Sequence, residues 1–123
     1  MEIKNAKITC TMLGIEDHGI MTFMLHLDYG GSGQGAGGYC LDTPIKLGDT
    51  FIKRVGTAAG MSLIMEIMEI VGVEKWEDLQ GKHIRAKSDF TGIEAIGHFL
   101  EDKWLNFKQF FEEFKAYEPL IKE

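Results

Sequence analysis

Cysteine is scarce in this chain: Cys10 and Cys40 are the only two among 123 residues. Their separation fits no zinc or redox motif, which argues against a metal centre built on thiolates. Both lie in stretches that alternate like strands, so we expect reduced thiols in or near the core. The sequence therefore predicts a protein that holds no metal.

Long apolar runs are missing as well. No stretch reaches the roughly 20 residues that a membrane-spanning helix needs. The first residues pass directly into a strand pattern and do not resemble a signal peptide. We therefore expect a cytoplasmic protein with no membrane partner.

Positive charge is in short supply: 13 lysines and arginines stand against 19 aspartates and glutamates, for a formal net charge of −6. Nucleic-acid-binding domains need a basic face, so nucleic acid is not expected as a partner. The balance leaves open an acidic surface that meets a basic protein. With 45% hydrophobic residues, residues 1–123 are predicted to form one soluble globular domain.

Catalytic patterns are equally sparse. The four histidines have no spacing typical of a helical zinc motif, and Ser32 does not sit in the G-x-S-x-G elbow of a hydrolase. Two strand faces combine a histidine with a carboxylate, His26 with Asp28 and His98 with Glu94. Ordinary hydrogen bonding or a surface position accounts for these histidines more readily than a polar site does. We expect a protein that is not an enzyme, with no catalytic residue and no cofactor.

What the chain has in excess is glycine, concentrated between Asp28 and Asp42 in the segment DYGGSGQGAGGYCLD. Such a run is costly to order and is tolerated where the backbone takes a positive φ or must be approached closely. Successive bare amides can form a concavity that binds anions. A flexible surface loop accounts for the run equally well. A GxGxxG match at Gly33, Gly35 and Gly38 is not followed by a helix, so a dinucleotide-binding fold is not predicted.

The remaining periodicities predict the fold. Alternation predicts strands at residues 3–13, 20–29, 82–89 and 93–100, and the segment 38–42 is predicted to return as a short strand. An almost continuously apolar stretch at 57–71 and an aromatic stripe at 106–118 predict two helices. The predicted fold is α+β: an antiparallel sheet of about five strands, made of two hairpins plus a short strand, with two helices on one face.

Local signals mark the ends of both helices. Thr57 is a suitable N-cap and Gly72 lies where a C-terminal cap belongs. Gly60 costs helix propensity, so it indicates close backbone packing. In the second helix, Asn106 begins a capping box, and Pro119 is predicted to end the helix. The first helix is so apolar that we expect it to be buried nearly all round, which favours a homodimer or higher homo-oligomer.

The residue types suited to an anion are an arginine beside a helix start, a second cationic strip, bare amides and aromatic rings. Arg54 precedes the helix at Thr57, although it could instead pair with a local acid. Arg85 and Lys87 supply the strip. The candidate ligand-binding residues are Tyr29, Gly31, Gly33, Gly35, Gly37, Tyr39, Arg54, Thr57, Arg85, Lys87 and Phe90.

Four segments carry a resemblance to a known family: ITCTMLGIEDHGIMTFMLHLDYGGSGQGAGGYCLD, RVGTAAGM, VGVEKWEDLQGK and AIGHFLEDKW. With them the chain resembles the phage and prophage Thoeris anti-defence proteins of the first kind. The resemblance implies a sponge that binds a cyclic ADP-ribose isomer made by TIR-domain immune enzymes and holds it intact at a subunit interface, in the cytoplasm of an infected bacterial host. Members of that family use arginines toward the C-terminus, whereas this chain has none after Arg85.

Three functions are compatible with these features. A cyclic nucleotide sponge needs amides, cations and aromatic surfaces, and the chain supplies them. An acidic inhibitor of a bacterial defence complex, similar to an anti-CRISPR protein, is the alternative that the net charge of −6 and the aromatic second helix favour. A nucleotide-cleaving enzyme is the least supported, because no acid–base pair is evident.

Overall fold

The computed structural model describes residues 1–16 and 18–121, which form eight strands, two α-helices and one 3-10 turn. The strands are β1 (Glu2–Glu16), β2 (Ile20–Asp28), β3 (Gly33–Gly37), β4 (Asp42–Leu47), β5 (Thr50–Gly56), β6 (His83–Asp89), β7 (Gly92–His98) and β8 (Trp104–Asn106). The helices are α1 (Ala58–Val71), η1 (Trp76–Leu79) and α2 (Phe107–Ile121).

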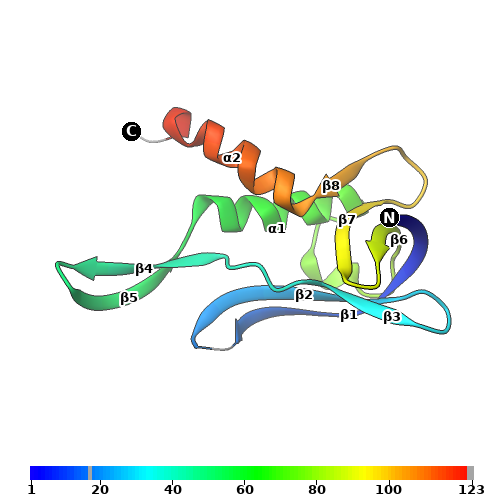
Figure 1. Ribbon diagram of the computed structural model, residues 1–123, viewed down its shortest axis with the longest axis horizontal. Coiled ribbons are helices and arrows are strands. Elements are labelled where there is room, and N and C mark those ends of the chain that lie inside the picture. The colour runs from blue at the N-terminus through cyan, green and yellow to red at the C-terminus, as the bar shows by residue number, and fades with distance from the viewer. Residues whose placement is uncertain (17, 122–123) are drawn as a thin grey trace.

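The predicted α+β class is confirmed, but the strand number is not. Six strands form one antiparallel sheet in the order β3-β2-β1-β6-β7-β8, and β4 and β5 form a separate two-stranded sheet. The prediction of about five strands was therefore wrong. Both helices lie on the same side of the large sheet (Figure 1).

The long strand β1 organises the large sheet because its two halves pair with different neighbours. Residues 7–16 pair with β2 and residues 2–7 pair with β6, with a register shift near Ile8. The β6–β7 hairpin stands up from the β1–β2 hairpin at this bend (Figure 1). As a result β3, at one edge, approaches the β6–β7 turn, where the Gln34 side chain donates to the Asp89 carbonyl at 2.7 Å.

The core lies between the sheet and helix α1. Phe23, Leu25, Leu63, Ile67 and Ile96 are completely buried there. Burial of this many large apolar side chains is the main stabilising contribution, at about 1.5–3 kcal/mol each relative to exposure. An aromatic cluster closes the side toward α2, and its members are Phe23, Tyr39, Trp76, Phe107 and Phe111.

Helix α1 begins and ends where its sequence signals predicted. The Thr57 hydroxyl accepts a hydrogen bond from the Gly60 N–H at 2.9 Å. Gly72 takes the left-handed conformation and donates its N–H to the Met68 carbonyl. The close approach predicted at Gly60 is also confirmed, because a Cβ atom there would lie 2.3 Å from the Leu41 carbonyl oxygen.

Burial of α1 on nearly all sides is not confirmed. Met61 and Met65 expose 63% and 59% of their surface, on the side of α1 away from the core. The exposed methionines therefore leave one stripe of α1 uncovered in the single chain.

Within the described part of the chain, neither helix has the length and apolar character to cross a membrane.

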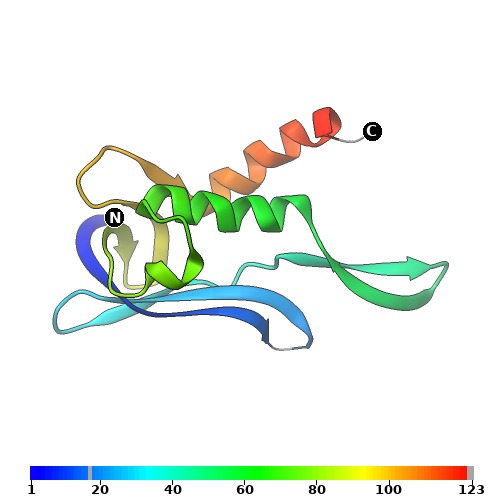
Figure 2. The same cartoon turned by 180° about the vertical axis from the view of Figure 1, so that it is seen from behind.

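The glycine-rich segment is paired differently from the prediction. Its strand is β3, which ends at Gly37 and pairs with β2. The prediction of a strand at residues 38–42 was wrong, because residues 38–41 form a connection and Asp42 begins β4. Gly37 and Gly38 both take positive φ, which ends the extended conformation. The chain then leaves the sheet and forms the β4–β5 hairpin, here called the arm, which projects from the body in both views (Figures 1 and 2).

Two smaller expectations also change. Cys10 and Cys40 are both exposed free thiols, so their predicted place in or near the core was wrong. Half of the capping box predicted at α2 is present: the Asn106 side chain accepts from the Gln109 N–H at 2.9 Å, whereas the Gln109 side chain donates to Glu113. Helix α2 also continues through Pro119 to Ile121.

Candidate functional site

The candidate ligand residues do not form one cluster. One end of the large sheet, at the β2–β3 and β6–β7 turns, holds Tyr29, Gly31, Gly33 and Phe90. Gly35 and Gly37 continue along β3. Tyr39, Arg54 and Thr57 lie near the base of the arm. Arg85 and Lys87 lie side by side along β6 against Trp104. A single phosphate site built from all of them is therefore not present in one chain.

A pocket of about 490 Å³ lies at this end of the large sheet, and we call it the mouth pocket. Its walls come from the start of β1, the β2–β3 turn and the β6–β7 turn. The lining residues are Met1, Glu2, Lys4, Tyr29, Ser32, Gly33, Gln34, Ser88, Asp89 and Phe90.

The glycine turn that walls the mouth pocket is held by specific contacts. Gly30 and Gly31 take φ of 88° and 132°, which glycine adopts without steric cost. The Gly30 N–H donates to the Asp28 carboxylate at 2.9 Å, and the Tyr29 N–H donates to the Ser32 carbonyl at 2.8 Å. Glycine is also needed at the start of β3, since a Cβ on Gly33 would lie 2.6 Å from the Leu27 carbonyl oxygen.

Two hydrogen bonds, together called the latch, connect the glycine turn to the β6–β7 turn on the opposite wall of the mouth pocket. The Tyr29 hydroxyl donates to Gln34 Oε1 at 2.7 Å, and Gln34 Nε2 donates to the Asp89 carbonyl at 2.7 Å. Lys4 lies beside the latch, with Nζ 4.9 Å from the centre of the Tyr29 ring. A cation over a tyrosine face is stabilised by about 0.5–1 kcal/mol at an exposed site. The mouth pocket thus holds an ordered ammonium group.

One further feature of the mouth pocket suits a ligand with an aromatic part. Phe90 is 97% exposed, so its ring is free to stack on a ligand. Ser88 lies behind the pocket wall: it is fully buried, and within the described residues its hydroxyl has no hydrogen-bond partner. A buried polar group without a partner costs about 1–3 kcal/mol. Because this hydroxyl has no accessible surface, it is not among the groups available to a ligand.

The carboxylate of Asp89 is engaged within its own turn. It accepts hydrogen bonds from the Thr91 hydroxyl and from the Thr91 N–H, the latter at 2.8 Å. These hydrogen bonds, the hydroxyl first, lower the pKa of Asp89. Asp89 is consequently a weaker base than an ordinary aspartate.

Arg54 is committed to a neighbouring acid. Its Nε and Nη2 atoms donate to the two carboxylate oxygens of Asp42 at 2.8 and 2.9 Å. The hydrogen bond from Arg54 is the main reason that the pKa of Asp42 lies well below its usual range. The alternative in which Arg54 pairs with a local acid is therefore confirmed. Thr57 beside it caps α1, and Tyr39 packs against Phe107 with ring centres 5.0 Å apart.

Arg85 is likewise engaged. Its Nε donates to the His98 carbonyl at 2.9 Å and its Nη2 to the Glu101 carbonyl at 2.8 Å. Strand register places Arg85 opposite Gly97, and Gly97 opposite Trp104. Since Gly97 has no side chain, the Trp104 ring lies over it and reaches both Arg85 and Lys87, at 4.9 and 4.4 Å. The cationic strip is a packing unit as well as a charged surface.

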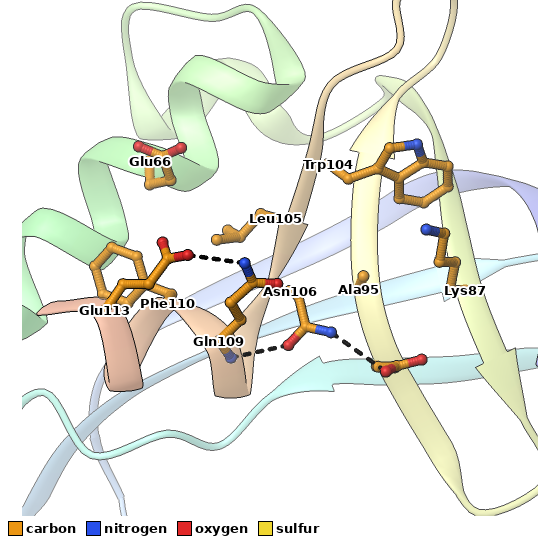
Figure 3. Close-up of a pocket in the computed structure, with 10 residues that line it drawn as sticks. Glu66, Lys87, Ala95, Trp104, Leu105, Asn106, Gln109, Phe110 and Glu113 are labelled. Carbon is orange, nitrogen blue, oxygen red and sulfur yellow. Dashed lines mark hydrogen bonds between the residues drawn. The ribbon is translucent and has the colours of Figure 1, made fainter.

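A second pocket, of about 260 Å³, lies around the edge strand β8 and between the two helices, and we call it the helix pocket (Figure 3). Its charged lining residues are Glu66, Glu94, Glu113 and Lys87. Partial burial, and secondly the charge of Glu69, raise the pKa of Glu66. Three carboxylates against one ammonium group make this pocket unsuitable for a phosphate.

His98, one of the two histidines that share a strand face with a carboxylate, has hydrogen-bond partners within the chain. His98 Nδ1 accepts hydrogen bonds from the N–H groups of Leu100 and Glu101, at 3.0 and 2.9 Å. The ordinary hydrogen-bonding role is thereby confirmed for His98. Among the described residues, no group of three or more His, Cys, Asp or Glu side chains could hold a metal ion.

Sequence reasoning missed three residues of these sites. The alternation that placed Ile84 and Ala86 inside β6 could have been extended by two positions to find Ser88. Nothing local indicated Lys4 or Trp104. Lys4 meets Tyr29 because Lys7 pairs with Asp28, which brings the start of β1 beside the end of β2.

Comparisons of the chain with protein-family models, with curated proteins and with solved structures find no match. The resemblance to the Thoeris anti-defence proteins remains a hypothesis.

Proposed function

We propose that this chain is a phage anti-defence protein that binds a cyclic ADP-ribose-type immune signal in the mouth pocket and sequesters it without cleaving it. The observation that carries the proposal is the convergence of an exposed ring and an ammonium group, Phe90 and Lys4, at one glycine turn. The proposed place of action is the cytoplasm of an infected bacterial host.

Each of these groups has a counterpart in a cyclic ADP-ribose-type ligand. An adenine base stacks on Phe90, since stacking on an aromatic ring is worth about 1–3 kcal/mol per base. A phosphate oxygen accepts a charge-assisted hydrogen bond from Lys4. The pocket volume of about 490 Å³ lies within the range of small-molecule sites, roughly 300–1,000 Å³.

Sequestration is favoured over cleavage by the state of the nearby carboxylate. A general base works best with a pKa close to the working pH. The hydrogen bonds from Thr91 lower the pKa of Asp89, which moves it further from neutral pH. Tight binding that does not favour the transition state gives no rate acceleration.

Calorimetric titration with a panel of cyclic ADP-ribose isomers tests the binding. Phe90→Ala should weaken binding about five- to a hundredfold, from the loss of one base stack. Lys4→Gln should weaken it about ten- to a hundredfold, from the loss of one charge-assisted hydrogen bond. Leu100→Ala and Lys82→Gln are matched controls, because both side chains are exposed and neither lines the mouth pocket. Equal affinity in all four variants would show that the ligand binds outside the mouth pocket.

Recovery of the ligand tests sequestration. The protein is mixed with the tightest isomer until free signal disappears, then denatured by heat, and the released material is analysed by mass spectrometry and by activation of a TIR-dependent effector. Intact, active ligand supports the proposal. Linear ADP-ribose would contradict it.

The second candidate, an acidic inhibitor of a defence complex, is favoured by one specific observation. Glu66, Glu94 and Glu113 gather at the helix pocket, with Glu112 on the adjoining surface. Such a face suits the basic channel of a nucleic-acid-binding complex. Charge reversal by Glu94→Lys together with Glu113→Lys should then abolish inhibition and leave calorimetric binding of the cyclic nucleotide unchanged.

A further inference from the structure

The arm is the least covered part of the molecule. Every residue from 43 to 53 is exposed, on both faces of a hairpin that pairs with no other strand. An isolated two-stranded hairpin is marginally stable in water. Four large apolar side chains nevertheless lie on it: Ile45, Leu47, Phe51 and Ile52. The arm thus carries the side chains of a buried element without a surface to bury them.

An apolar groove lies at the foot of the arm. Its volume is about 170 Å³, and it is bounded by Leu13 and Met21 of the β1–β2 hairpin and by Met61 and Ile64 of α1. The arm, the β1–β2 tip and the beginning of α1 lie at the same end of the molecule in both views (Figures 1 and 2). The arm and the apolar groove are therefore adjacent parts of one face, which we call the arm face.

The apolar area of the arm face matches what a stable dimer buries. Eight large apolar side chains on it expose between 38% and 76% of their surface: Leu13, Ile15, Ile45, Leu47, Phe51, Ile52, Met61 and Met65. At roughly 60–120 Å² of apolar area for a large aliphatic side chain, together they expose on the order of 400 Å². Each partner of a stable interface contributes about 800 Å², of which roughly 450 Å² is non-polar.

Charge identifies a fitting partner. Residues 42–56 carry three basic and two acidic side chains, a net charge of +1. Because the net charge of the whole chain is −6, the remaining residues carry −7. A partner for the arm should be acidic, and the body of this chain is strongly so. A second copy offers the complementary charge together with the apolar groove.

We propose that the arm face is a self-association surface, on which a second copy of this chain packs with each arm in the groove of the other. A twofold arrangement of this kind uses the same patch on both subunits and forms every contact twice. The proposal does not depend on the mouth pocket, since none of the pocket's lining residues belongs to the arm or the groove.

Light scattering after size-exclusion chromatography, on the full chain at tens of micromolar, tests it. The wild type should have twice the chain mass of 13.8 kDa. Leu47→Asp with Phe51→Asp removes the arm contact in both subunits and should weaken association by about a hundredfold or more, giving a single-chain mass. Met61→Glu with Met65→Glu should do the same from the groove side.

The matched control is Phe90→Asp with Leu100→Asp, which removes two apolar side chains exposed by 97% and 82% away from the arm face. This variant should keep the dimer mass. All variants change exposed positions, and circular dichroism verifies that each is folded. A wild-type mass of 13.8 kDa, or a dimer that survives the arm substitutions, would overturn the proposal. Loss of the dimer in the arm variant but not in the groove variant would overturn the arm-in-groove arrangement.

Discussion

Replacing Gly60 with alanine should destabilise this protein, although the same change stabilises most helices. A Cβ atom on Gly60 would lie 2.3 Å from the Leu41 carbonyl oxygen and 2.8 Å from its carbonyl carbon. Leu41 is held on both sides, because its N–H donates to the Met21 carbonyl and its own carbonyl accepts from the Thr57 N–H. The contact can only be relieved by moving backbone.

The expected size follows from two opposing effects. Alanine in place of glycine gains about 1 kcal/mol of helix propensity. Overpacking typically costs about 1–3 kcal/mol, and the upper end applies at Gly60 because the obstacle is backbone that is hydrogen-bonded on two sides. We expect a net loss of about 2 kcal/mol in the free energy of unfolding. With a urea dependence of about 1–3 kcal/mol per molar, the midpoint should fall by about 1 M.

Urea unfolding followed by far-UV circular dichroism measures the effect. Gly56→Ala is the matched control, because a Cβ atom there has no neighbour within 4 Å. It should leave the free energy of unfolding unchanged or raise it by about 0.4–1 kcal/mol, through the lower entropy of the unfolded chain. A Gly60→Ala midpoint equal to or above that of the wild type would refute the close-contact reasoning.

Three further predictions concern side chains outside the mouth pocket. Gly97→Ala should displace the Trp104 ring, which lies 2.6 Å from the position of the new Cβ, and change tryptophan fluorescence; an unchanged spectrum would count against the stack. Glu66→Gln should raise the urea midpoint at pH 7, because burial raises the pKa of Glu66 and its ionised form is the unfavourable one; the gain should vanish near pH 3, and a lower midpoint at pH 7 would contradict it. Asp42→Asn should lower the midpoint at pH 7, because the lowered pKa of Asp42 contributes stability above its unfolded value of about 3.9; the difference should narrow as the pH falls below that value, and a gap independent of pH would argue against the Arg54 pair.

Local sequence alone determined the helix boundaries of α1. Thr57 and Gly72 act through hydrogen bonds to residues three or four positions away, whereas the partner of Gly60, the Leu41 carbonyl, was decided by tertiary structure. The two capping effects depend on neighbours along the chain, so they are readable from sequence. The alternation of β6 was readable for the same reason, because one face of that strand is buried, whereas β7 is buried on both faces from Ala95 to Gly97.

The pairing of the glycine-rich segment was decided by tertiary structure. Residues 33–37 carry almost no side-chain pattern, so nothing in them distinguishes a strand from a loop. They form β3 because the absence of side chains allows close approach to β2, where a Cβ on Gly37 would lie 2.4 Å from the Phe23 carbonyl oxygen. The strand is therefore specified by its neighbour more than by its own residues.

Tertiary structure also decided which candidate residues meet. Sequence identified Tyr29, Gly33 and Phe90 as ligand candidates, but Lys4 joins them only because β1 pairs with β2 at one position and with β6 at another. The same long-range pairing separates Arg54 and Arg85 from the mouth pocket and gives each of them partners in the chain. Residue type determines which chemistry is available, whereas strand register determines which side chains share a pocket.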